Sequence, residues 1–167
     1  FSKEDLKTLI KYNVPAYKIA SAEINYIQLL EEVSNQKKPI ILSTGMAIES
    51  DIVTALKIFK NNNVVILLCN SSYPTNYKDI NLNGIRYISE KFNTIVGLSD
   101  HSIGNTIPIT AVSLGAKLIE KHIKLKDDKK SPDHFFSINT KDFGIMIKEI
   151  RNVELTLNNK KFLFKPS

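Results

Sequence analysis

The chain alternates short apolar segments with segments of helical periodicity, and this alternation restricts its fold more than any other feature. Strand-like runs begin near residues 17, 39, 64, 94 and 118, and Val64–Cys69 is apolar throughout. Continuous apolar runs separated by helices are typical of parallel strands in a sheet that helices cover. The sequence therefore predicts an α/β protein with five parallel strands.

Helical segments fill the intervals between these runs. Ser2 is expected to begin the first helix as an N-cap, with Asp5 three residues further on in the position that completes a capping box. Thr140 is placed to cap a last long helix that runs through Val153. The other predicted helices cover Tyr26–Val33, Ile52–Phe59, Ile85–Phe92 and Pro108–Leu114.

Two architectures are compatible with five strand–helix units. A (β/α)8 barrel takes about 250 residues, whereas this chain has 167 and begins with a helix that no strand precedes. We predict a TIM (β/α)8 barrel present as a partial barrel without its first strands. The alternative is a complete, smaller doubly wound sheet, although the GxGxxG and GxxxxGK[ST] phosphate loops of many such domains are absent from the sequence.

Composition restricts the class of protein further. No apolar stretch approaches the roughly 20 residues of a membrane span, and the N-terminus lacks the pattern of a signal peptide. The single cysteine, Cys69, excludes an internal disulfide and fits a reducing compartment, so we expect a cytoplasmic protein. The net charge is +6, but the lysines are scattered, so the pattern favours a solvated surface and a small anionic substrate over nucleic acid.

Polar side chains gather where the predicted strands end. In barrels of this type the active site is built at the carboxyl ends of the strands, so these groups are expected to converge. Lys18 lies between apolar neighbours, where an ammonium group is costly to bury without an anion. The segment Ser43–Gly45 is either a turn that starts a helix or an anion-binding loop whose backbone N–H groups approach a phosphate.

His101 and His122 each follow one of two successive strands, 21 positions apart. In a parallel βαβ unit this spacing brings neighbouring strand ends side by side. Either histidine alone is more often structural, but a pair at equivalent positions is able to share a metal ion and leave the open coordination positions that catalysis needs.

Six motifs in the chain carry a specific resemblance to a known family. They are Lys18–Glu23, Leu42–Met46, Cys69–Pro74, Gly97–His101, Ile119–His122 and Pro132–His134. Their order resembles that of the N-acetylneuraminate (sialic acid) synthase family, which includes legionaminate and pseudaminate synthases. The resemblance extends from about residue 3 to residue 155.

The resemblance implies a TIM-barrel transferase that condenses phosphoenolpyruvate with an N-acetylated amino sugar such as N-acetylmannosamine. The products are a nonulosonic acid and phosphate, and a divalent metal, Mn²⁺ or Mg²⁺, lies near the sugar aldehyde. It also implies that the full-length form is a homodimer.

The resemblance assigns roles to eleven residues. His101 and His122 resemble the metal ligands, and Glu23 resembles a catalytic carboxylate on the sugar side that handles the proton of the attacking water. Tyr73 and Asp133 also resemble sugar-side groups. The phosphoenolpyruvate-contacting set corresponds to Lys18, Ser21, Ser43, Gly45, Ser71 and Ser99.

The chain departs from the family pattern in two ways. Ala22 and Ser131 stand where glycine is frequent, and Leu68 stands where histidine is frequent. In addition, residues 1–155 correspond to about strands 4–8 of the barrel, and residues 156–167 to an exit linker toward an absent C-terminal antifreeze-like domain. We therefore expect the isolated chain to be inactive. The alternatives are a phosphoenolpyruvate-condensing synthase for another sugar and a non-catalytic anion-binding α/β domain.

Overall fold

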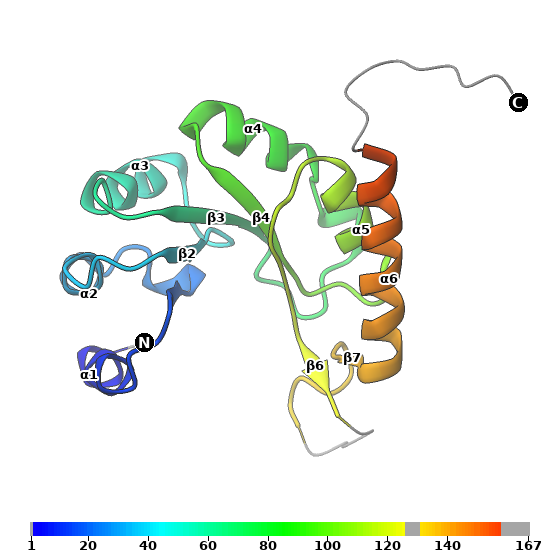
Figure 1. Ribbon diagram of the computed structural model, residues 1–167, viewed down its shortest axis with the longest axis horizontal. Coiled ribbons are helices and arrows are strands. Elements are labelled where there is room, and N and C mark those ends of the chain that lie inside the picture. Colours follow the sequence, from blue (N-terminus) through cyan, green and yellow to red (C-terminus); the bar gives the residue numbers. More distant parts are fainter. Residues whose placement is uncertain (1, 126–130, 158–167) are drawn as a thin grey trace, which may run out of the picture.

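A computed structural model of the chain describes residues 2–125 and 131–157. Its main sheet contains five parallel strands, hydrogen-bonded in the order β1-β2-β3-β4-β5 (Figure 1). The strands are β1 (Tyr17–Ile19), β2 (Ile40–Ser43), β3 (Val64–Cys69), β4 (Ile95–Asp100) and β5 (Ile119–Lys121). The five predicted strands are therefore confirmed, with small shifts at their ends.

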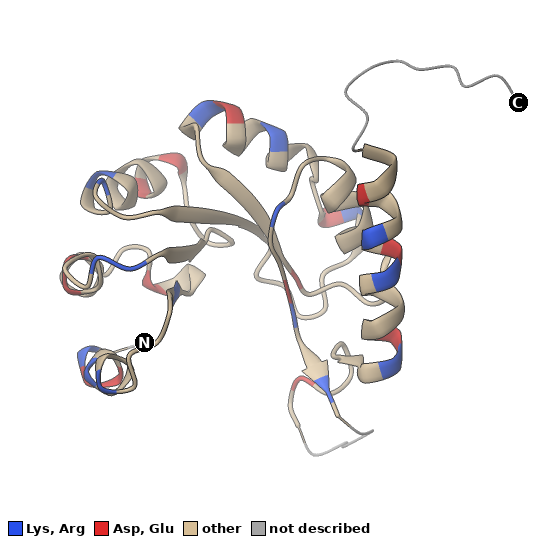
Figure 2. Ribbon diagram, in the orientation of Figure 1, with Lys and Arg blue, Asp and Glu red and all other residues tan. Residues whose placement is uncertain are grey.

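Helices connect these strands and surround the sheet. The α-helices are α1 (Lys3–Lys11), α2 (Ile27–Ser34), α3 (Glu49–Ile58), α4 (Asn83–Phe92), α5 (Thr106–Ser113) and α6 (Thr140–Leu157). Two single turns of 3-10 helix, η1 (Ser21–Glu23) and η2 (Tyr77–Asp79), follow β1 and β3. In Figure 2 the basic and acidic residues of these helices are interspersed rather than separated onto different elements.

The strand order decides between the two predicted architectures. A doubly wound sheet contains a point at which the strand order reverses, whereas the five strands here follow one another without reversal. The helices accordingly follow an arc around the strands, from α1 through α4 to α5 and α6 (Figure 1). The sheet is thus a parallel half-barrel, and the doubly wound alternative is wrong.

The core lies between the sheet and the surrounding helices. Leu30 on α2, Ile40 and Leu42 on β2, and Ile66 on β3 have no exposed surface. A second buried cluster, which includes Met146 of α6, joins that helix to α5. Burial of these side chains on one face of the strands holds the sheet in place and leaves the strand ends free to carry polar groups.

Local interactions explain where several elements begin and end. The capping box of α1 is confirmed: the Ser2 side chain accepts the Asp5 N–H at 3.1 Å and the Asp5 carboxylate accepts the Ser2 N–H at 2.9 Å. Helix α3 begins earlier than the predicted Ile52, at Glu49, because the Asp51 carboxylate accepts the N–H of the residue before the helix at 2.9 Å.

The apolar run that begins near residue 118 and extends to Ile123 is divided between two strands in different sheets. Strand β5 ends at Lys121, and β6 (Ile123–Lys124) pairs with β7 (Ile138–Asn139) in a separate two-stranded sheet. The chain leaves the main sheet at His122, whose carbonyl accepts the Ile138 N–H at 2.9 Å.

The C-terminal helix also differs from the prediction. Helix α6 continues to Leu157, past the predicted boundary at residue 155. The rest of the predicted linker, residues 158–167, lies outside the described residues. Within residues 2–125 and 131–157, no helix has both the length and the apolar character that crossing a membrane requires.

Gly97 in β4 allows the close approach of the chain entering β5, and we predict that its substitution destabilises the fold. A Cβ atom there would lie 2.4 Å from the Leu118 carbonyl oxygen and 2.6 Å from a methyl carbon of Leu67. We expect Gly97→Ala to lower the free energy of unfolding by about 1–3 kcal/mol, measured by urea denaturation.

Gly144 in α6 provides the matched control. A Cβ atom there meets nothing within 4 Å, and alanine is the better helix former. Gly144→Ala should therefore be neutral or slightly stabilising. Equal stabilities for the two variants would contradict the packing account of Gly97.

Candidate active site

A cavity of about 370 Å³ opens at the carboxyl ends of the strands. It contains the groups that the strand-end pattern predicted to converge. The predicted site residues that line it are Lys18, Ser21, Ser43, Ser71, Tyr73, Ser99, His101 and His122. The convergence of polar groups from all five strands is therefore confirmed as a matter of geometry.

The two histidines lie side by side, as their spacing predicted. Their ring centroids are 5.3 Å apart. His101 is buried, and its Nδ1 lies 2.9 Å from the carbonyl oxygen of Asn70. A carbonyl only accepts hydrogen bonds, so Nδ1 carries the hydrogen and Nε2 keeps a lone pair. His122 Nδ1 lies 3.3 Å from Asp133 Oδ2, which orients the second ring in the same way.

Aromatic rings hold the imidazoles in place. The Tyr73 ring lies 4.1 Å from the ring of His101, and the Phe136 ring lies 4.8 Å from that of His122. Phe136 is buried, and sequence reasoning did not select it. The sequence signal for Phe136 is its position two residues after the last motif, Pro132–His134.

The electrostatic environment favours a neutral His101 and a protonated Tyr73. Burial lowers the pKa of His101, and the neighbouring His122 lowers it further, while the hydrogen bond to Asn70 opposes the shift. Burial also raises the pKa of Tyr73, assisted by the nearby Cys69, Asp133 and Glu120. A neutral imidazole is the form that binds a metal ion.

Glu120 is a site residue to which the sequence analysis assigned no role, although it lies in the motif Ile119–His122. Its Oε1 accepts a hydrogen bond from Ser99 Oγ at 2.7 Å and lies 3.4 Å from Lys18 Nζ. The signal was available, because Glu120 lies two residues before His122 and therefore on the same face of the strand. The expectation of a buried Lys18 is wrong: 32% of its side-chain surface is exposed, and it faces the cavity.

Small residues form the other wall of the cavity. Ser21 Oγ accepts the Gly45 N–H at 2.9 Å, so this N–H is not directed at a ligand as the anion-loop hypothesis expected. A Cβ atom at Gly45 would lie 2.5 Å from Ser71 Oγ and 3.0 Å from Cys69 Sγ, so the glycine keeps these groups close together. The buried hydroxyl of Ser43 has no hydrogen-bond partner among the described residues.

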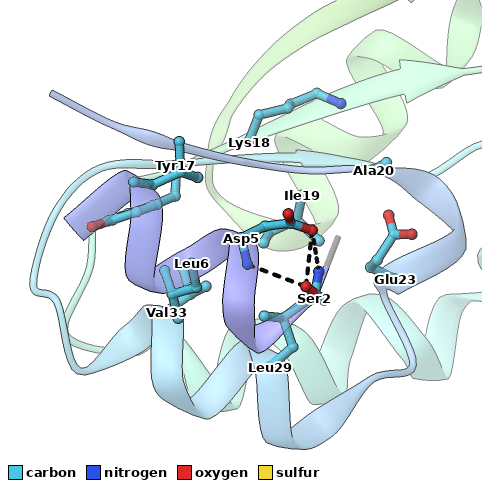
Figure 3. Close-up of a pocket in the computed structure, with 11 residues that line it drawn as sticks. Ser2, Asp5, Leu6, Tyr17, Lys18, Ile19, Ala20, Glu23, Leu29 and Val33 are labelled. Atoms are coloured by element: carbon cyan, nitrogen blue, oxygen red, sulfur yellow. Dashed lines mark hydrogen bonds between the residues drawn. The ribbon is translucent and has the colours of Figure 1, made fainter. Parts of the chain in front are cut away.

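Three predicted residues, Gly45, Asp133 and Glu23, are not among those that line the cavity. Asp133 contacts His122, as described above. Glu23 borders a neighbouring pocket of about 220 Å³ between α1, β1 and α2, which Figure 3 shows together with Lys18. The Oε2 atom of Glu23 is buried without a hydrogen-bond partner in the part of the chain that the structure describes. Lys18 lines both spaces.

The fold and the cavity together define an α/β-barrel type of protein with a polar site at the carboxyl ends of its strands. Comparison with known proteins then specifies the family. The NeuB family model matches residues 1–162, and the chain belongs to this family.

Characterised relatives are similar over almost all of the chain. It is 43% identical to a pseudaminic acid synthase of Campylobacter jejuni over 164 residues, which are 96% of this chain and 48% of that protein. It is 32% identical to an N,N'-diacetyllegionaminic acid synthase of Legionella pneumophila, covering 95% of this chain and 47% of the relative. The chain thus spans about half the length of the curated relatives it matches.

A solved structure has the same fold. The crystal structure of an N-acetylneuraminic acid synthetase from Leptospira borgpetersenii, in complex with citrate, superimposes with a TM-score of 0.93 at 35% identity. The match covers 99% of this chain and 59% of that one.

The lowered pKa of His101 predicts a pH dependence of stability. Between this lowered value and the ordinary histidine pKa of about 6.5, the unfolded chain binds a proton that the folded chain excludes. Stability should therefore fall as the pH falls through that range. We expect the unfolding temperature of His101→Gln to decrease less than that of the wild type between about pH 7.5 and about pH 5.5. Parallel pH profiles would contradict this account of His101.

Proposed function

We propose that this chain forms part of the active site of a synthase that condenses phosphoenolpyruvate with an N-acetylated amino sugar to give a nonulosonic acid and phosphate. One observation carries the proposal. Two imidazoles, each held at Nδ1, stand in a cavity whose opposite wall presents Lys18 and several serine hydroxyls. The family to which the chain belongs, and the named activities of its relatives, point in the same direction.

We propose that His101 and His122 hold a divalent ion, Mn²⁺ or Mg²⁺, through their Nε2 atoms. The donor set fits, because both Nδ1 atoms are already engaged and burial favours the neutral form of His101. Among the described residues, no group of three or more His, Cys, Asp and Glu side chains is placed to hold a metal ion. In this proposal substrate and water would take the remaining coordination positions, and the bound ion would act as a Lewis acid on the sugar aldehyde.

The other residues bind and orient the substrates. Lys18 and the hydroxyls of Ser21, Ser43, Ser71 and Ser99 would hold the phosphate and carboxylate of phosphoenolpyruvate. Anion binding at Lys18 would compete with its contact to Glu120. The two atoms are 3.4 Å apart and the side chains are 32% and 39% exposed, so this contact is easily exchanged.

The reaction balances with these groups. Carbon 3 of the enol forms a bond to the aldehyde carbon, whose oxygen takes up a proton and becomes a hydroxyl. Water adds to carbon 2, and phosphate leaves with the second proton by cleavage of its C–O bond as carbon 2 becomes a carbonyl. Glu23 would accept the proton of the attacking water, since one of its carboxylate oxygens is buried without a partner among the described residues. Tyr73 and Asp133 would contact the sugar.

We also propose that β1–β5 are strands 4–8 of an eight-stranded barrel. Within the described residues, β1 and β5 each pair on one side only, and further strands would complete the wall and the site. On this basis the 167-residue chain alone should show no turnover. The family resemblance further supports a homodimer for the complete enzyme, and the single cysteine supports a cytoplasmic location.

The activity is tested by phosphate release from phosphoenolpyruvate, with the full polypeptide, Mn²⁺ and a panel of sugars. The panel contains the amino-sugar precursors of pseudaminic, legionaminic and N-acetylneuraminic acids. We expect turnover with one of them, and the higher identity to a pseudaminic acid synthase favours the first. Phosphate release with none of the panel, but with another aldehyde sugar, would instead support a related condensing synthase.

Metal analysis of two variants tests the histidine pair. His101→Ala and His122→Ala should each lose bound Mn²⁺ and lower kcat/KM by about 100-fold or more, because a Lewis acid contributes several kcal/mol to such a reaction. Unchanged metal content and unchanged activity in both variants would refute the metal site. Anion binding without turnover would then favour the non-catalytic alternative.

A further inference from the structure

A buried ion pair lies directly beside the two histidines. Asp100 and Lys121 precede His101 and His122, and they are register partners on β4 and β5. Asp100 Oδ2 and Lys121 Nζ are 2.5 Å apart, and only 1% and 2% of their side-chain surfaces are exposed. The pair is therefore almost completely removed from water.

The ion pair also fixes the backbone on both sides of His101. Lys121 Nζ donates a second hydrogen bond to the Ser102 carbonyl at 2.7 Å. The Ser102 N–H in turn donates to Asp100 Oδ1 at 2.9 Å. The residues before and after His101 are thus both attached to the residue that precedes His122.

These charged groups do not belong to the cavity itself. Ser99, His101, Glu120 and His122 line it, whereas the ion pair does not. This follows from strand geometry, since successive side chains point to opposite faces of a sheet. The pair therefore supports the histidines from the opposite face and does not contact a substrate in the cavity.

A contribution to the stability of the fold does not by itself explain why these two positions carry a buried ion pair. Removing two charges from water costs several kcal/mol per ion, and well-packed apolar residues are often as stabilising as a buried ion pair. Directional contacts provide what apolar residues do not, namely a fixed geometry between two strand ends. Here the ion pair joins the two strand ends that His101 and His122 follow.

We propose that Asp100 and Lys121 are positioning residues that set the spacing of His101 and His122 for a shared divalent ion. The inference rests on the proposed function, because it assumes that the histidines bind a metal. Its effect should appear in metal affinity, since partners that orient metal ligands typically contribute 10-fold to 100-fold to binding.

The test measures the Mn²⁺ dissociation constant of the full polypeptide by electron paramagnetic resonance, together with its unfolding temperature. Lys121→Met leaves a buried carboxylate without its partner and should both destabilise the protein and weaken Mn²⁺ binding about 10-fold or more. The double variant Asp100→Leu/Lys121→Met removes both charges. It should regain part of the lost stability and still bind Mn²⁺ about 10-fold more weakly than the wild type.

Two further variants keep the test decisive. Lys117→Met removes an exposed lysine just before β5 and should leave the affinity unchanged. Lys121→Arg keeps the charge but replaces a compact ammonium with a planar guanidinium, so it should weaken Mn²⁺ binding even if both apolar variants fail to fold. Wild-type affinity in the double variant, or in Lys121→Arg, would overturn the inference.

His101→Ala separates the two possible failures. If it loses Mn²⁺ while the double variant binds like the wild type, the positioning role is wrong and the metal site stands. If His101→Ala also binds Mn²⁺ like the wild type, the metal site itself is wrong, and the positioning role fails with it.

Discussion

The parallel pairing of β4 with β5 is the constraint on which the site depends. Its register aligns Ser99 with Glu120 and Asp100 with Lys121, and the two histidines follow directly. Gly97 permits this pairing, because any side chain at its position would collide with the chain that enters β5. One short strand pair thus positions the imidazoles, the carboxylate that contacts Lys18, and the buried ion pair on the opposite face.

Most of the fold could be predicted from periodicity, because burial of apolar side chains dictates both the strands and the helices. The misplaced elements have local causes that a hydrophobic pattern does not contain. Helix α3 begins early because Asp51 caps it, and the last strand ends at Lys121 because the backbone of His122 pairs with a different strand. The strand order, which excluded a doubly wound sheet, was not determined by the sequence pattern alone.

Sequence patterns could predict which side chains meet at the site, but they could not predict the contacts that backbone groups make there. The spacing of His101 and His122 predicted that the two rings lie close together. No sequence pattern indicates that the Asn70 carbonyl orients the His101 ring. The reason given for Lys18 was wrong, although its position at the cavity was right, because the lysine is partly exposed and already faces Glu120. The chain belongs to the NeuB family, and the roles of these residues, the sugar and the metal are proposals.

The central claim is that the two imidazoles bind one divalent ion. Electron spin-echo envelope modulation of the Mn²⁺-loaded full polypeptide tests it most directly, because the method detects nitrogen nuclei bonded to the ion. The account predicts couplings from two imidazole nitrogens, and no nitrogen-coupled Mn²⁺ signal in His101→Ala or His122→Ala, because each variant loses the ion. A spectrum of bound Mn²⁺ without nitrogen coupling would contradict it.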